Sequence, residues 1–248
     1  MILIKSRDEL VRMRDAGRIV AEIHALLQDK IAPGVTTLEL DRIAERECRK
    51  RGAKPAFKGY GGFPFSICAS PEDRVVHGFP SDRPLTEGEI LSIDFGVVLN
   101  GFYGDSAVTL PVGIISAEKQ RLLDVARRSL ELGIEQAQVN NRLFDISYAI
   151  QNHVEKCGFS IVKEFVGHGI GRGLHEDPQV PNFGPPGQGP ILRSGMVLAI
   201  EPMINAGKAA VKVLDDGWTA VTLDGKPSAH FEHTVAITDE GPRILTAI

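Results

Sequence analysis

The sequence has few cysteines. Only Cys48, Cys68 and Cys157 occur among its 248 residues, and no two of them form a Cys-x-x-Cys pair. An odd number of cysteines without such pairs argues against a disulfide framework and against a thiolate zinc site. We therefore expect reduced thiols, which are typical of a cytoplasmic protein.

Long hydrophobic runs and an excess of positive charge are also missing. No stretch approaches the roughly 18 apolar residues that a membrane span requires. The first residues, Met1–Glu9, lack the hydrophobic core and cleavage site of a signal peptide. Lys and Arg number 28 against 32 Asp and Glu, which gives a net charge of −4. We therefore expect a cytoplasmic protein that binds neither DNA nor a membrane.

Helical periodicity and capping boxes predict two helices in each half of the chain, and strands follow each pair. The predicted helices lie at about residues 6–30, 36–52, 116–138 and 144–157. The repeated order predicts one α+β domain over residues 1–248, built from two related halves at about 1–112 and 113–248. Gly and Pro concentrate between Gly167 and Gly195, and a long loop of this kind inside a compact domain is typical of a functional segment.

Two aspartates lie in an apolar hairpin, which the Asn-Gly pair at positions 100 and 101 predicts. With a two-residue turn, Asp94 faces Ala107, and Asp105 is its diagonal neighbour on the same face, about 7–8 Å away. Like charges on an apolar face cost several kcal/mol unless they are protonated, paired or bound to metal. An exposed acidic turn is the alternative, and it fits Asp105 better than Asp94.

The second half shows the same anomaly. Glu201 ends one apolar strand and Glu232 lies in another. Histidines complete the set. His77 follows a short Val-Val run, and His168 and His175 bracket three alternate glycines. We expect these glycines to let the backbone approach a ligand closely. Many carboxylates with few imidazoles suit paired Mn, Fe, Co or Zn ions of a hydrolytic centre better than a structural zinc.

Four motifs resemble those of the bacterial type I methionine aminopeptidases, within metallopeptidase family M24, and the resemblance covers essentially the whole chain. They are I-D-F-G-x(7)-G-D-S-A at Ile93–Ala107, G-H-G-I-G-R-G-x-H-E-x-P-Q-V at Gly167–Val180, I-E-P-M at Ile200–Met203 and F-E-H-T at Phe231–Thr234. The resemblance implies the pseudo-twofold "pita-bread" fold, with helices backing a curved antiparallel sheet. It also implies two divalent ions per chain (Co, Mn, Fe, Zn or Ni), bridged by Asp105 and Glu232. The full ligand set that it implies is Asp94, Asp105, His168, Glu201 and Glu232.

The same resemblance implies an activity: removal of the initiator methionine from nascent chains whose second residue is small. In the family, Glu201 would move a proton from water to the leaving amine, His175 would stabilise the oxyanion, and His77 would contact the substrate near the scissile amide. The chain would act as a monomer on nascent N-termini at the ribosome. The resemblance also places the methionine side chain in a pocket, although these residues are equally compatible with core packing: Phe57, Tyr60, Phe63, Cys68, Leu174 and Trp218.

The sequence departs from the family pattern without losing a ligand. The departures are Glu72 for asparagine, Phe79 for isoleucine, Leu174 for an aromatic residue, His230 for glutamine, and Val139-Asn140-Asn141 for a Pro-Gly turn. Two other functions stay open. An X-Pro dipeptidase or aminopeptidase shares the fold, but those enzymes carry an additional N-terminal domain for which this chain has no room. A non-catalytic relative that binds ribosomes or RNA would typically have lost metal ligands.

Overall fold

The computed structural model describes residues 1–248, and its four main helices lie where the sequence predicts them. Helix α1 (Arg7–Gln28) begins at a capping box, in which Ser6 and Glu9 accept one another's backbone N–H groups. The Thr36 side chain caps α2 (Thr37–Lys50) by accepting the Glu39 N–H. The second pair is α3 (Ala117–Gln136) and α4 (Leu143–Lys156). No helix is both long and apolar enough to span a membrane.

The predicted hairpin has the predicted register. Strands β4 (Ile90–Leu99) and β5 (Phe102–Pro111) are antiparallel, with Asp94 opposite Ala107 and Asp105 opposite Gly96. The alternative of an exposed acidic turn is wrong for Asp105, because that residue is buried. Two shorter strands, β1 (Lys54–Pro55) and β2 (Cys68–Pro71), pair with the other edge of β4.

The C-terminal half contributes a five-stranded antiparallel sheet in the order β15-β14-β9-β7-β8. Its strands are β7 (Gly167–Gly169), β8 (Glu176–Val180), β9 (Val197–Ile200), β14 (His233–Thr238) and β15 (Gly241–Ile244). Two small antiparallel sheets flank it. They comprise β6 (Ser160–Ile161), β10 (Met203–Asn205) and β13 (Ser228–His230), and β3 (Arg74–Val76), β11 (Val211–Val213) and β12 (Ala220–Thr222). A short 3₁₀ turn, η1, spans Tyr60–Gly62.

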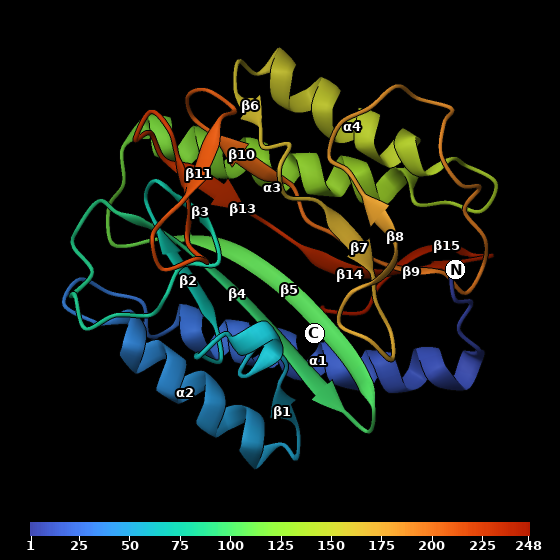
Figure 1. Ribbon diagram of the computed structural model, residues 1–248, viewed down its shortest axis with the longest axis horizontal. Coiled ribbons are helices and arrows are strands. Elements are labelled where there is room, and N and C mark those ends of the chain that lie inside the picture. The colour runs from blue at the N-terminus through green and yellow to red at the C-terminus, as the bar shows by residue number, and fades with distance from the viewer.

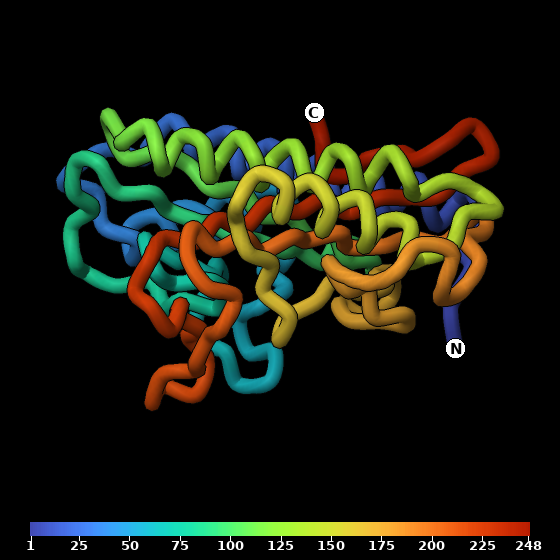
Figure 2. The backbone as a smooth tube through the Cα atoms, turned by 90° about the horizontal axis from the view of Figure 1, so that it is seen from above, coloured from blue at the N-terminus to red at the C-terminus, as the bar shows by residue number.

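The helices back the strands. In Figure 1 the strands run between the pair α1 and α2 and the pair α3 and α4. In Figure 2, which is turned by 90°, α3 lies along one side, while the cyan loop near residue 60 and the orange-red loop near residue 215 project from the opposite side. This arrangement confirms the predicted α+β fold, in which helices back antiparallel strands. It also leaves one face of the strands free of helices, where a cavity can form.

Helix α1 crosses β5 and the segment that follows β15 so closely that only glycine fits there. A Cβ atom on Gly17 would clash with the carbonyl group of Leu245, which follows β15, 2.7 Å from its carbon, and one on Gly104 of β5 would lie 2.8 Å from the Gly17 nitrogen. Gly17→Ala should therefore lower the free energy of unfolding by about 1–3 kcal/mol, although alanine favours a helix. Urea denaturation measures this loss.

Gly133→Ala provides the matched control within α3. A Cβ atom on Gly133 would meet mainly the flexible Ile150 side chain, which can move aside. Its cost should be clearly smaller than that of Gly17→Ala. Equal stability of the Gly17→Ala variant and the parent protein would contradict the close crossing.

Candidate metal centre

The protein contains a cavity of about 650 Å³, and every site residue that the sequence analysis names lines it. Asp94 comes from β4, Asp105 from β5 and His168 from β7, while Glu201 follows β9 and Glu232 immediately precedes β14. The cavity is therefore built from both halves of the chain.

Hydrogen bonds join the two halves at the centre of this cavity. Glu232 donates its backbone N–H to Ala107 O at 2.9 Å, and Asp105 donates its own to Thr234 Oγ1 at 3.0 Å. Thr234 Oγ1 in turn donates to Asp105 O at 2.7 Å. The carboxyl-bearing segments of β5 and of the chain before β14 are thus fixed against one another.

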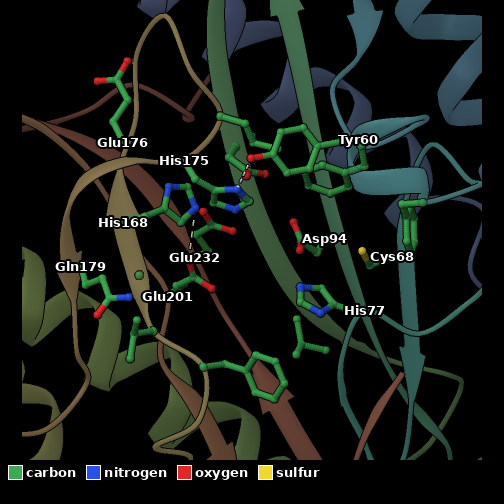
Figure 3. A pocket seen from close by; sticks show the side chains of 18 of the residues that line it. Tyr60, Cys68, His77, Asp94, His168, His175, Glu176, Gln179, Glu201 and Glu232 are labelled. Carbon is green, nitrogen blue, oxygen red and sulfur yellow. Dashed lines mark hydrogen bonds and ion pairs between the residues drawn. The ribbon is translucent and has the colours of Figure 1, made fainter. Parts of the chain in front are cut away.

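The acidic side chains converge on a small volume (Figure 3). Asp105, His168 and Glu232 offer ligand atoms that all lie within 4.8 Å of one another. Glu201 Oε1 lies 3.4 Å from His168 Nε2, and Asp94 lines the same cavity beside them. Nitrogen and oxygen atoms at these spacings can share one ion, because each ligand lies about 2.0–2.2 Å from a bound transition metal.

Burial dominates the electrostatics of the four carboxyl groups. It raises the pKa of Asp94 to about 7 and that of Glu201 to about 8. The pKa values of Asp105 and Glu232 are also raised well above their usual range, first by burial and then by the neighbouring acids. Asp94 Oδ1, Asp105 Oδ1 and Glu232 Oε1 are buried without a hydrogen-bond partner. Oxygen atoms that only accept, and that have no donor, fit divalent cations.

His168 is oriented as a ligand. Its Nδ1 lies 2.9 Å from the Gly169 carbonyl oxygen, so Nδ1–H donates and the lone pair of Nε2 faces Glu201. Burial lowers the pKa of His168 to about 4, which keeps the ring neutral. A neutral imidazole fixed by a hydrogen bond from its other nitrogen is the usual form of a metal ligand.

The other two histidines flank the carboxylates. The His175 ring lies 4.3 Å from that of His168, centre to centre, and its Nδ1 lies 2.8 Å from the Tyr60 hydroxyl. His77 lies edge-on to Phe165 and Trp218. Burial lowers the pKa of His77 to about 4 and also lowers that of His175. All three rings are therefore neutral near pH 7.

The prediction that the glycines between His168 and His175 let the backbone approach a ligand stays a prediction. A Cβ atom on Gly169 would lie 2.6 Å from the Asp177 carbonyl carbon, and one on Gly171 would lie 2.9 Å from Lys5 Nζ. Gly169 and Gly171 therefore make room for neighbouring protein groups. The convergence of the two rings, however, is as predicted.

Aromatic residues form one wall of the cavity. The Phe63 ring packs against Trp218 at 5.2 Å and against Phe79 at 5.4 Å, so the departure at position 79 adds an aromatic ring behind this wall. Phe57, Cys68 and Leu174 also line the cavity. The sequence analysis missed further lining residues, and the only signal for them is that they adjoin recognised motifs: Val76, Glu164, Phe165, Val166, Gly167, Glu176, Asp177 and Gln179.

Two other departures have clear structural roles. Glu72 Oε1 accepts the Ile90 N–H and pairs with Lys119 Nζ at 2.6 Å. His230 is almost fully buried, and its Nε2 lies 3.6 Å from Glu201 Oε2. Glu72 therefore ties β4 to α3, and His230 contacts the metal centre from behind.

Comparison with known proteins agrees with the motifs. The sequence profile of "Metallopeptidase family M24" matches residues 11–239. A methionine aminopeptidase of Clostridium perfringens is 58% identical over 248 residues, and the match covers 100% of both chains. Methionine aminopeptidase 1 of Bacillus subtilis is 56% identical over the same length, again with 100% of both chains covered.

Solved structures show the same likeness. The crystal structure of methionine aminopeptidase from Thermotoga maritima superposes with a TM-score of 0.99 at 46% identity, and the match covers 100% of both chains. A prolidase from Pyrococcus furiosus has a TM-score of 0.80 at 21% identity, but the match covers 65% of that chain and 99% of this one. The prolidase shares the fold alone.

Proposed function

The chain belongs to metallopeptidase family M24, and from that membership we propose that it removes the N-terminal methionine from proteins whose second residue is small. One observation carries the proposal: three buried carboxyl groups, the half-buried Asp94 carboxyl group and a neutral imidazole converge in the cavity, and three of the carboxyl oxygen atoms have no hydrogen-bond partner. The full-length similarity to proteins named methionine aminopeptidase supports the choice of substrate. An X-Pro peptidase has weaker support, because the prolidase match extends only to the fold.

We assign the metal-binding role to five residues, which would hold two divalent ions. The carboxylate-rich set with one imidazole accepts Mn, Fe, Co, Zn or Ni. Ions bound there would lower the pKa of a bound water and polarise the carbonyl group of the substrate. The five residues are Asp94, Asp105, His168, Glu201 and Glu232.

Glu201 is the group that moves the proton. Its carboxyl group is buried and lies within the cavity, 3.4 Å from His168 Nε2. With bound ions the group would be an ionised carboxylate, which can take a proton from the attacking water and release it to the leaving amine. Glu201 therefore acts first as a base and then as an acid.

His175 stabilises the oxyanion. With the Tyr60 hydroxyl donating to Nδ1, the neutral ring carries its proton on Nε2 and can donate it to the developing negative charge. His77, which also lines the cavity, contacts the substrate near the scissile amide. The methionine thioether packs among the wall residues, since sulfur contacts aromatic rings favourably. These wall residues are Phe57, Tyr60, Phe63, Cys68, Leu174 and Trp218.

The natural substrates are nascent chains at the ribosome, and residues 1–248 act as a single catalytic domain and as a monomer. A free terminal amine is a good metal ligand, which restricts cleavage to the first residue. This restriction suits a processing enzyme that must leave the rest of the chain intact.

A peptide assay tests the activity. With Mn²⁺ or Co²⁺ added, Met-Ala-Ser should release methionine, and Met-Leu-Ser should be cleaved at least about tenfold more slowly, because a small pocket excludes extra methylene groups. Chromatography with mass detection measures both rates. No cleavage of Met-Ala-Ser with any divalent metal would contradict the proposal, and faster cleavage of Met-Pro-Ser would favour the X-Pro peptidase.

A further inference from the structure

A buried ion pair ties the segment before α1 to the loop that carries His175. Lys5 Nζ lies 2.6 Å from Glu176 Oε2, and the two side chains are 5% and 9% exposed. In every other Lys or Arg ion pair of the chain the cation is at least 21% exposed. Isolated pairs on the surface contribute little, whereas removing one partner of a buried pair leaves an uncompensated charge.

The backbone around Lys5 is shaped to receive it. A Cβ atom on Gly171 would lie 2.9 Å from Lys5 Nζ, and one on Gly195 would lie 2.7 Å from Lys5 O. Lys5 also donates its backbone N–H to Gly195 O at 2.7 Å. Glycine at positions 171 and 195 therefore gives Lys5 its place, and one of these glycines belongs to the His168–His175 motif.

Glu176 uses its other carboxylate oxygen to fold the loop on itself. Oε1 accepts the backbone N–H groups of Arg172 at 2.8 Å and of Gly173 at 2.9 Å. In Figure 3 the Glu176 side chain points away from the cavity, while the adjacent His175 ring points toward His168. The Glu176 carboxylate thus joins the backbone at Arg172 and Gly173 to Lys5, next to His175 in the sequence.

The cavity side of His175 has weaker support. Its one side-chain hydrogen bond is with Tyr60, which is 43% exposed and lies in the short 3₁₀ turn η1. A group that stabilises a transition state must be held to within about 0.5 Å of its productive position. The rigid support for His175 therefore comes from behind, where the loop is tied to the segment before α1.

We propose that Lys5 and Glu176 are positioning residues, which hold the His175 ring where the oxyanion forms. The inference rests on the proposed role of His175. It assigns a catalytic consequence to an ion pair that contains no metal ligand and whose Glu176 side chain points away from the cavity (Figure 3).

The first test is Lys5→Met in the full-length, Mn²⁺-loaded enzyme. We expect kcat for Met-Ala-Ser to fall by about 10- to 100-fold, part of what the loss of an oxyanion donor costs, while KM and bound Mn²⁺ stay unchanged. The phosphonic acid analogue of methionine mimics the tetrahedral intermediate. Its inhibition constant should rise by about the same factor by which kcat falls. Inhibition by methionine itself should not change.

Arg172→Gln is the matched control. It breaks the exposed pair of Arg172 with Glu9, which joins the same loop to α1. We expect kcat to change by less than about twofold, because exposed pairs contribute little. A loss in this variant as large as that in Lys5→Met would overturn the assignment to the buried pair.

The double variant Lys5→Met/Glu176→Gln separates positioning from the cost of an unpaired charge. It buries no lone charge, so its melting temperature should return toward that of the parent, and it keeps the test open if Lys5→Met fails to fold. We expect kcat to stay low. Recovery of kcat together with the melting temperature would overturn the inference.

His175→Ala distinguishes this inference from the proposed function. If His175→Ala leaves kcat unchanged, the proposed role of His175 fails, and the positioning role fails with it. If His175→Ala lowers kcat but the folded double variant does not, only the positioning role fails.

Discussion

The Glu232→Gln variant is expected to lose at least about 1,000-fold in kcat/KM for Met-Ala-Ser, the upper range for removal of one electrostatic group from an active site. Glu232 is 2% exposed, and its Oε1 has no hydrogen-bond partner. A neutral amide attracts a cation less than a carboxylate does, and its NH₂ group would face the other acids. The variant should therefore retain less metal, which elemental analysis after gel filtration measures.

Glu240→Gln is the matched control for this experiment. Glu240 lies in the exposed turn between β14 and β15, so the same substitution removes one charge without touching the cavity. Its activity and metal content should equal those of the parent. Full metal content in a folded Glu232→Gln variant would contradict the assignment of Glu232 as a ligand.

The second large effect concerns the metal-free protein, which should become less stable as the pH rises from 7.5 to 8.5. Burial raises the pKa of Glu201 to about 8, and raises those of Asp105 and Glu232 well above their usual range. The folded protein therefore holds protons that the unfolded chain has already lost. We expect the free energy of unfolding to fall by up to about 1.4 kcal/mol per pH unit for each such carboxyl group, the full value holding while the folded group keeps its proton.

The sign of this effect distinguishes the carboxyl groups from the histidines. A carboxyl group with a raised folded pKa stabilises the fold at low pH, and this stabilisation is lost as the pH rises through that pKa. Burial lowers the pKa of His24, His77, His168 and His233 to about 4, so they contribute stability that increases up to about pH 7 and then stays constant. Above pH 7.5 the slope belongs to the buried acids and, in smaller part, to the thiols of Cys48 and Cys68, because burial raises their pKa values too while unfolded thiols begin to ionise there.

Urea denaturation of metal-free and Mn²⁺-loaded protein at both pH values checks this prediction. In the loaded protein the ions keep the carboxylates ionised, so the loss of stability should be smaller and the stabilisation by Mn²⁺ should grow with pH. Equal slopes for the two forms would contradict the account.

Much of the site could be predicted because local patterns determine it. An Asn-Gly turn fixes the register of β4 and β5, and side chains alternate along strands, so Asp94 and Asp105 had to share a face. Acidic residues in predicted apolar strands marked Glu201 and Glu232 in the same way, although the structure ends β9 just before Glu201 and begins β14 just after Glu232, so the prediction that Glu232 lies within a strand is wrong. The caps and periodicity of the helices gave their positions to within a few residues.

The rest depends on contacts between distant parts of the chain, which no local pattern encodes. Nothing near Lys5 in the sequence indicates that its ammonium group lies under the loop of Glu176. The hydrogen bonds between Asp105 and Thr234 likewise join segments that are far apart in the sequence. The glycines between His168 and His175 illustrate the difference between local patterns and distant contacts. Their spacing could be recognised in the sequence, whereas the residues that they contact in the fold could not.

Anomalous diffraction from crystals of the Mn²⁺-loaded protein tests the central claim most directly. The account predicts two manganese peaks about 3.5–4 Å apart, with Asp105 and Glu232 contacting both ions. The remaining ligands would be Asp94, His168 and Glu201. A fully loaded, active enzyme without manganese at these five side chains would contradict it.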